Sequence, residues 1–178
     1  SSGFGGLLCL LGSFTIRSTI TVGFGVSISG SGSYATFVNQ GADCSCFAFT
    51  NYNSGYIENI RFAGGRNYPI ITIESTSLLS IRTCRFENCA GGAIYMDKGW
   101  SISIRDCWFI NCGTVANSTA AIRGVATSLE NTGILIDHNV FEYNDYQDIY
   151  FTGGLLDCNI TNNAFEFDNN AGGDYNIK

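Results

Sequence analysis

The sequence predicts an all-β fold: a right-handed parallel β-helix, or solenoid, of about seven coils with about 24 residues in each. Three observations predict it. An isoleucine followed five positions later by a phenylalanine recurs along the chain, short segments of alternating apolar residues lie between the recurrences, and the 178 residues include 22 glycines but a single proline. Proline is rare in strands with neighbours on both sides, because it has no N–H to donate to the ladder.

The isoleucine–phenylalanine pair is the clearest repeat. The isoleucines are Ile57, Ile81, Ile104, Ile136 and Ile160, and their partners are Phe62, Phe86, Phe109, Phe141 and Phe165. Successive isoleucines are separated by 24, 23, 32 and 24 residues. A repeat of this length indicates a solenoid, because one short unit cannot bury its apolar face alone and stacked units bury a continuous core.

Alternation within each repeat predicts the strands. Leu79 and Ile81 share one face of an extended chain, because successive side chains point to opposite sides. A second alternating segment follows each phenylalanine, at residues 71–73, 94–96, 122–124, 149–151 and 175–177. Frequent β-branched residues and glycines exclude long helices, and a register that repeats in one direction excludes an antiparallel sandwich. We expect one domain over residues 1–178, with less regular coils in 1–50 and regular coils in 51–178.

Composition and charge exclude several classes of protein. The chain is 45% hydrophobic and 13% charged, which is too apolar for a disordered protein. A formal net charge of −6 argues against nucleic-acid binding, which needs clustered lysine and arginine. No apolar stretch approaches the length of about 18 residues that predicts a membrane helix, so we expect no membrane insertion. We predict no cofactor and no metal, because the eight cysteines and the single histidine lack zinc-site spacing.

Four cysteines occupy two equivalent positions in adjacent repeats. Cys84 corresponds to Cys107, and Cys89 corresponds to Cys112. Stacked equivalents would lie close enough for a disulfide, but equivalent side chains in a parallel ladder point the same way, which is a poor geometry for one. The pattern therefore predicts free thiols that pack as small apolar side chains.

One coil is longer than its neighbours by eight or nine residues. The excess falls in two polar segments, residues 113–120 and 127–132. Insertions in solenoids project from one face and often build a binding surface. A tolerated surface loop is the alternative interpretation.

The sequence also resembles a known superfamily. The run GSFTIRSTITVGFGVSISGSGSYAT (residues 12–36) is similar to the opening coils of pectin-lyase-like right-handed parallel β-helix proteins, and the units IRDCWF, IDHNVF and ITNNAF are similar to their generic repeats. The resemblance extends from about residue 12 to residue 177 and is closest in character to phage tailspike-type proteins. It implies the fold but not one activity, because lyases, hydrolases, epimerases, tailspikes and inert structural proteins share it.

No catalytic set stands out in the sequence. A hydrolase needs paired carboxylates, and a pectate-type lyase needs a carboxylate cluster for calcium with a basic residue nearby. The cluster Asp137-His138-Asn139 is suggestive, but it occupies the turn position of the repeat, so we interpret it as a turn. One position after each isoleucine lies a column of Glu58, Arg82, Arg105, Asp137 and Thr161, and the neighbouring opposite charges in it are interpreted as solvated ladder pairs. The catalytic residues are therefore unknown, and we lean against an enzyme.

A binding surface is better supported. The outward column of the second strand consists of Thr72, Tyr95, Arg123, Tyr150 and Asn176. Tyrosine and arginine planes stack on sugar rings, and polar side chains nearby hydrogen-bond to hydroxyls. We predict a substrate-binding set of Tyr95, Arg123, Tyr150, Asp97, Trp100 and Asp148, with Lys98 beside it. The alternative is that tyrosines are simply favourable residues on a half-exposed sheet.

Three functional hypotheses follow. The first is a structural or receptor-binding module of a viral, tailspike-like, or cell-surface appendage that recognises a polysaccharide or other glycan. The second is a polysaccharide lyase or glycoside hydrolase, and the third is a purely structural fibre or shell protein. Because a bare solenoid end exposes a sheet edge and apolar core, we expect a segment of a longer chain or a homo-oligomer, with a trimer implied by the tailspike resemblance. The expected location is the virion or an extracellular appendage.

Overall fold

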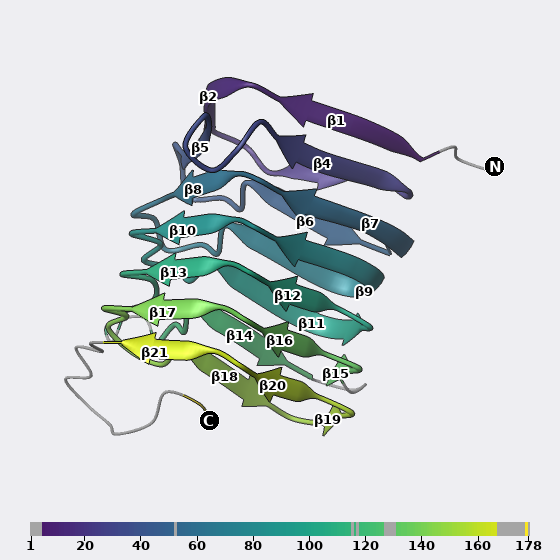
Figure 1. Ribbon diagram of the computed structural model, residues 1–178, viewed down its shortest axis with the longest axis vertical. Coiled ribbons are helices and arrows are strands. Elements are labelled where there is room, and N and C mark those ends of the chain that lie inside the picture. Colours follow the sequence, from purple (N-terminus) through teal and green to yellow (C-terminus); the bar gives the residue numbers. More distant parts are fainter. Residues whose placement is uncertain are drawn as a thin grey trace.

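The computed structural model describes residues 5–51, 53–114, 116, 118–126, 131–166 and 177, except for the side chain of residue 53. Within these residues the chain forms 21 strands, and every pairing between named strands is parallel. The coils stack from the N-terminal strand at one end to the last coil at the other (Figure 1).

Three strand ladders run along the stack. The phenylalanine sheet consists of β2 (Gly12–Ile16), β5 (Thr36–Gln40), β8 (Arg61–Ala63), β10 (Arg85–Glu87), β13 (Trp108–Ile110), β17 (Val140–Glu142) and β21 (Ala164–Glu166). The groove sheet consists of β3 (Ile20–Val22), β6 (Phe47–Thr50), the first half of β9 (Ile71–Arg82), β11 (Ile94–Trp100), β14 (Ile122–Val125) and β18 (Ile149–Thr152).

The isoleucine sheet is the third ladder. It consists of β1 (Gly6–Leu10), β4 (Val26–Gly30), β7 (Asn53–Glu58), the second half of β9, β12 (Ser103–Arg105), β15 (Asn131–Thr132), β16 (Leu135–Asp137), β19 (Leu155–Leu156) and β20 (Asn159–Thr161). The long strands β9 and β11 join it to the groove sheet, so the two form one bent sheet of 14 strands. The all-β solenoid and its spacing of about 24 residues are confirmed; the seven strands of the phenylalanine sheet correspond to about six turns, close to the seven coils expected.

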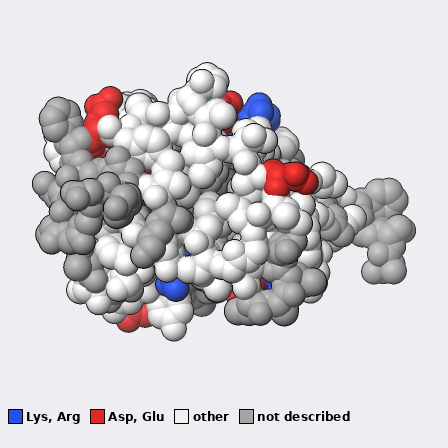
Figure 2. Space-filling model, turned by 90° about the horizontal axis from the view of Figure 1, so that it is seen from below, with Lys and Arg blue, Asp and Glu red and all other residues white. Residues whose placement is uncertain are grey.

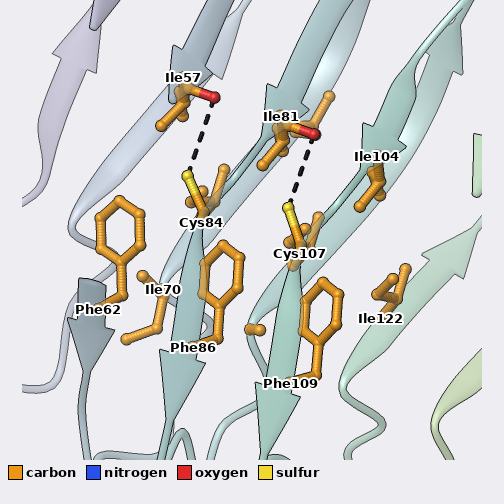
Figure 3. Close-up of a cluster of buried hydrophobic side chains, with 14 of the residues drawn as sticks. Ile57, Phe62, Ile70, Ile81, Cys84, Phe86, Ile104, Cys107, Phe109 and Ile122 are labelled. Atoms are coloured by element: carbon orange, nitrogen blue, oxygen red, sulfur yellow. Dashed lines mark hydrogen bonds between the residues drawn. The ribbon is translucent and has the colours of Figure 1, made fainter. Parts of the chain in front are cut away.

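The repeat residues of the sequence form the core. Ile57 pairs with Ile81, and Phe62 with Phe86, in exact coil-to-coil register. The five phenylalanine rings stack with centroids 5.1, 5.0, 4.9 and 5.1 Å apart. Figure 3 shows three of these rings, those of Phe62, Phe86 and Phe109, beside the isoleucine column. The stack is continuous because each coil places the same ring one strand spacing further along the axis.

The cysteine prediction is confirmed: all eight cysteines are free thiols. Cys84 donates a hydrogen bond to the carbonyl of Ile57 at 3.9 Å, and Cys107 donates one to Ile81 at 3.7 Å (Figure 3). In the next coil, Asn139 occupies the position equivalent to Cys84 and Cys107, and its Nδ2 donates to the carbonyl of Ile104 at 3.0 Å. Thiol and amide therefore serve the same purpose, because each supplies a donor to a carbonyl at the turn.

The turns between the isoleucine and phenylalanine sheets require left-handed backbone. The residues with positive φ there are Asn59, Thr83, Asp106, His138 and Asn162, with φ between 50° and 59°. Asparagine and aspartate tolerate this conformation better than most residues, which accounts for their frequency at the position. His138 is exposed and belongs to this column, and its Nδ1 lies 2.8 Å from the Asp137 carboxylate. The Asp137-His138-Asn139 segment is thus a turn, as interpreted from the sequence.

Candidate functional site

The predicted outward column exists in register. Thr72 pairs with Tyr95, Tyr95 with Arg123, and Arg123 with Tyr150, all on the outer face of the groove sheet. These side chains are half-buried. Asn176, the fifth member, lies outside the described residues.

A groove of about 330 Å³ lies over part of this column, on the outer face of β9, β11 and β14. These three strands are neighbours in the stack (Figure 1). Thr72, Tyr95 and Arg123 form its floor, and Glu74 lies one outward position further along β9. The remaining lining comes from turns that flank the sheet: Asn67, Tyr68, Pro69, Gly91, Thr119 and Ala120, together with Ile94 of β11. Three coils therefore build one depression, which no single repeat forms.

The first wall is the turn that carries Tyr68. Gln40 donates from Nε2 to the carbonyl of Tyr68 at 2.9 Å and to that of Cys44 at 2.7 Å, so it ties this turn to the preceding coil. Gly91 lies directly behind the turn, and a Cβ at that position would meet the Tyr68 backbone at 2.4 to 2.5 Å. Glycine is required there because the two backbones approach too closely for a side chain.

The second wall comes from the oversized coil. Thr114 and Thr119 close the insertion with two backbone hydrogen bonds of 3.1 Å. The hydroxyl of Thr119 also donates to the carbonyl of Ala90 at 2.8 Å, which fixes the insertion to the neighbouring coil. Thr119 and Ala120, at the end of the segment at residues 113–120, thus line the groove, whereas residues 115, 117 and 127–130 lie outside the described residues.

The charges around Tyr95 are two carboxylates and one guanidinium: Glu74 and Arg123 line the groove, and Asp97 lies beside it, outside the lining. Glu74 and Asp97 are partners in register, so two carboxylates occupy neighbouring outward positions. The pKa of the Tyr95 hydroxyl is raised, first by burial and next by the Asp97 carboxylate; Arg123 opposes this shift and Glu74 adds to it. Asp97 therefore affects the pKa of the Tyr95 hydroxyl more strongly than Arg123 does.

Two polar atoms of this site are buried and have no hydrogen-bond partner within the described residues: Nε of Arg123 and Oδ1 of Asp97. Both residues remain half-buried as a whole, so other atoms of the same side chains reach the surface. A buried donor and a buried acceptor without partners are costly in a folded protein, which marks them as places where a ligand or water would be favourable.

Comparison with known proteins identifies the architecture. The family model for the right-handed beta helix region matches residues 8–125, about two thirds of the chain. The chain belongs to the right-handed β-helix family. Among solved structures, this β-helix is similar to ORF18 of Geobacillus virus E2, with 19% sequence identity and a TM-score of 0.78. The match covers 93% of this chain but 34% of the viral chain, so this β-helix spans about a third of that protein. No curated protein matches the chain.

The β-helix does not gather every predicted site residue. Tyr150 continues the column beyond Arg123 but is not part of the groove lining. Trp100 pairs with Ser77 and Thr132, beyond the bend that Lys98 makes with φ of 60°, and it does not line the groove either. The bend turns the end of β11 away from the groove floor.

The placement of Asp148 corrects the sequence interpretation. Its exposed fraction is 1%, and its Oδ1 accepts a hydrogen bond from Nδ2 of Asn144 at 2.5 Å. The aspartate therefore belongs to the buried turn before β18 and is not available to a ligand on the surface. Alternation counted back from Ile149 places it outward, but the chain at that point is still turning into the strand.

The sequence interpretation missed Glu74 and the turn at Tyr68. Glu74 was detectable, because it lies two residues after Thr72 and so shares its face. The insertion at residues 113–120 was predicted as a possible binding surface, but its partner wall was not: Tyr68 and Thr119 lie 51 positions apart and meet around the same groove only through stacking of the coils.

A second cluster lies on the outer face of the phenylalanine sheet. Arg61 and Arg85 are in register, and Glu87 forms an ion pair with both. The guanidinium of Arg85 lies 4.7 Å from the centroid of Trp108, and that of Arg61 lies 5.4 Å from the ring of Phe37. The arginines thus have carboxylate and aromatic partners within the protein, and this cluster stabilises the sheet.

Other site chemistries have less support. In the part of the chain that the structure describes, no three histidine, cysteine, aspartate or glutamate side chains are grouped to hold a metal ion. Among the same residues, no helix is long and apolar enough to cross a membrane. Figure 2 shows the end of the stack that carries the last coil, where charged side chains are scattered among uncharged ones.

Proposed function

We propose that this β-helix is a receptor-binding module of a viral or cell-surface appendage, and that it binds a polysaccharide in the groove over β9, β11 and β14. The observation that carries the proposal is the joint placement of Tyr95 and Arg123 on the floor of a walled groove. The similarity in fold to a protein of a virus supports the viral setting.

The groove chemistry fits a sugar chain. The ring of Tyr95 offers an apolar face for the C–H side of a pyranose, and its hydroxyl offers a polar edge. Arg123 and Thr72 supply donors and acceptors for ligand hydroxyls. The volume of about 330 Å³ is near the lower end of ordinary ligand sites, so the groove accommodates a short segment of the polymer.

A second candidate function is cleavage of the bound polysaccharide. Glu74 and Asp97 form a carboxylate pair in register beside Tyr95. Glycoside hydrolases use two carboxylates on either side of the scissile bond. This pair is the specific feature that favours a hydrolase over a lyase.

Binding to a panel of polysaccharides by isothermal titration calorimetry tests the proposal. Wild-type protein is expected to bind at least one member, and Tyr95→Ala is expected to weaken that binding by about tenfold or more, because a buried aromatic anchor typically contributes strongly. Tyr56→Ala is the matched control, since Tyr56 lies on the isoleucine sheet and packs on Arg82. Equal losses in the two variants, or no binding by wild type, would contradict the proposal.

The same samples separate the alternatives. Chromatography of the polysaccharide after incubation detects shortened or unsaturated products, which would establish the enzyme instead of a pure binding module. The proposed homotrimer is checked by the mass in solution from analytical ultracentrifugation.

A further inference from the structure

Two carboxylates and one guanidinium act on Tyr95 at the centre of the groove floor. Glu74 and Arg123 are the charged side chains that line the groove among the described residues, and Asp97, the partner of Glu74 in register, lies beside the lining on the same outward face. Lys98 and Arg66 occur nearby in sequence, but neither lines the groove and neither is among the charges that shift the pKa of Tyr95. The pKa of the Tyr95 hydroxyl reflects these charges, because Asp97 and Glu74 raise it while Arg123 lowers it.

This charge arrangement affects which saccharides bind. A uronate, sulfate or phosphate group on the sugar would gain an interaction with Arg123 but would also lie near the carboxylate of Glu74 in the lining and that of Asp97 beside it. Like charges at such distances repel, and the repulsion is stronger in a partly desolvated groove than in bulk water. An acidic polymer therefore gains one favourable ionic contact against two unfavourable ones.

The unsatisfied polar atoms favour a hydroxyl-bearing ligand. Nε of Arg123 needs an acceptor and Oδ1 of Asp97 needs a donor. A sugar hydroxyl both donates and accepts, so neighbouring hydroxyls on one neutral ring satisfy both atoms after a small side-chain shift. A carboxylate on the ligand has no proton to give to Asp97 at neutral pH.

We propose that the groove is selective for an uncharged saccharide and discriminates against acidic polysaccharides, with Glu74 and Asp97 as the residues that determine this specificity. The inference rests on the proposed function, because it concerns the ligand class of the same groove. Arg123 then acts as a hydrogen-bond donor to hydroxyls and does not act as an anion receptor.

The test compares a neutral polysaccharide with a uronate-rich one of similar chain length, each measured by calorimetry at low and at physiological salt. Wild type is expected to bind the neutral polymer at least about fivefold more tightly at low salt, since each partly exposed charge contributes up to about fivefold. The preference should shrink as salt screens the carboxylates.

Variants then test the assigned residues. Glu74→Gln, at an exposed position, and the double variant with Asp97→Asn are expected to improve binding of the uronate polymer stepwise, by about threefold or more per charge removed. Glu142→Gln is the matched control, because Glu142 lies on the outer face of the phenylalanine sheet. This variant should leave the affinities for the neutral and for the uronate-rich polysaccharide unchanged.

The outcomes are distinguishable. Tighter binding of the uronate polymer by wild type, or no gain from Glu74→Gln and the double variant, would overturn the selectivity while leaving polysaccharide binding intact. A partly deacetylated amino polysaccharide is the third arm, and its preference over the neutral polymer would also overturn the choice of an uncharged ligand. A protein that binds no member of the panel removes the proposed function, and the inference falls with it.

Discussion

The rings of Phe86 and Phe109 are parallel to within 2°, with centroids 5.0 Å apart. Both side chains are completely buried, and each belongs to the central residue of its strand. The stack continues to Phe62 on one side and Phe141 on the other. A shift of one residue in any coil would turn its phenylalanine to the outer face, so this column holds all coils in one register.

Removing one ring from the middle of the stack should be costly. Phe109→Ala is expected to lower the free energy of unfolding by about 3 to 5 kcal/mol, because it loses the buried ring and leaves a cavity between two others. Phe165→Ala should cost clearly less, since Phe165 is only half-buried in the last described strand of the stack. Denaturant unfolding followed by circular dichroism measures both. Equal losses of unfolding free energy in the two variants would show that a central ring contributes no more to stability than the ring at the end of the stack.

The close approach at Gly91 should be needed for the groove. Gly91→Ala places a methyl group against the Tyr68 backbone and is expected to displace that wall, which weakens polysaccharide binding and lowers the melting temperature. Gly65→Ala is the control, because a Cβ there meets nothing within 4 Å. Calorimetry and thermal melting report the two effects. If Gly91→Ala binds the polysaccharide with the same affinity as wild type, the wall does not contact the ligand.

Thiol reactivity should follow burial. Cys9 is exposed and is expected to react rapidly with a disulfide reagent at pH 8, whereas the buried thiols react only on unfolding. The buried thiols are Cys46, Cys84, Cys89, Cys107 and Cys112. Burial, with a smaller effect of Cys44, raises the pKa of Cys46 to about 12, and burial is also the main reason that the pKa values of Cys89 and Cys107 are raised. A thiol is unreactive while it stays protonated and inaccessible.

The measurement is a time course of thiol modification with and without denaturant. The variant Cys9→Ser should lack the fast phase. Rapid modification of a buried thiol in native protein would contradict the packing of the turn columns.

The carboxylate of Asp137 should titrate unusually low. Hydrogen bonds from His138, Thr161 and Asn162, in that order of importance, lower its pKa from 3.8 to about 2. A lowered pKa in the folded state means that the stabilisation is present above the ordinary value and is lost as pH falls from about 4 towards 2. Carbon NMR of the carboxyl group follows the titration directly.

The variant His138→Asn keeps a residue that tolerates the left-handed turn but removes the imidazole donor. We expect the pKa of Asp137 to rise towards 3.8 in this variant. An unchanged titration would mean that the histidine does not hold the carboxylate.

The candidate site was only partly predictable. The outward column of Tyr95 and Arg123 followed from alternation and repeat length, since both are local properties of the chain. Asp148 and Trp100 were misplaced relative to the groove because alternation holds only inside a strand, whereas Asp148 lies in a turn and Trp100 follows the bend at Lys98. A left-handed residue breaks the alternation locally, so the side chains directly after it no longer continue the face predicted before it.

The sequence by itself determined the parallel solenoid, its repeat length, the phenylalanine and isoleucine columns and the free thiols. These properties depend on a pattern that recurs along the chain, and each recurrence supports the same register. Only the tertiary structure decided that the turn at Tyr68 and the insertion at Thr119 enclose one groove, and that Glu74 lies beside Asp97 of the neighbouring coil. Such contacts depend on which residues stacking brings together, and the spacing of residues along the chain does not record how turns of different length project from the stack.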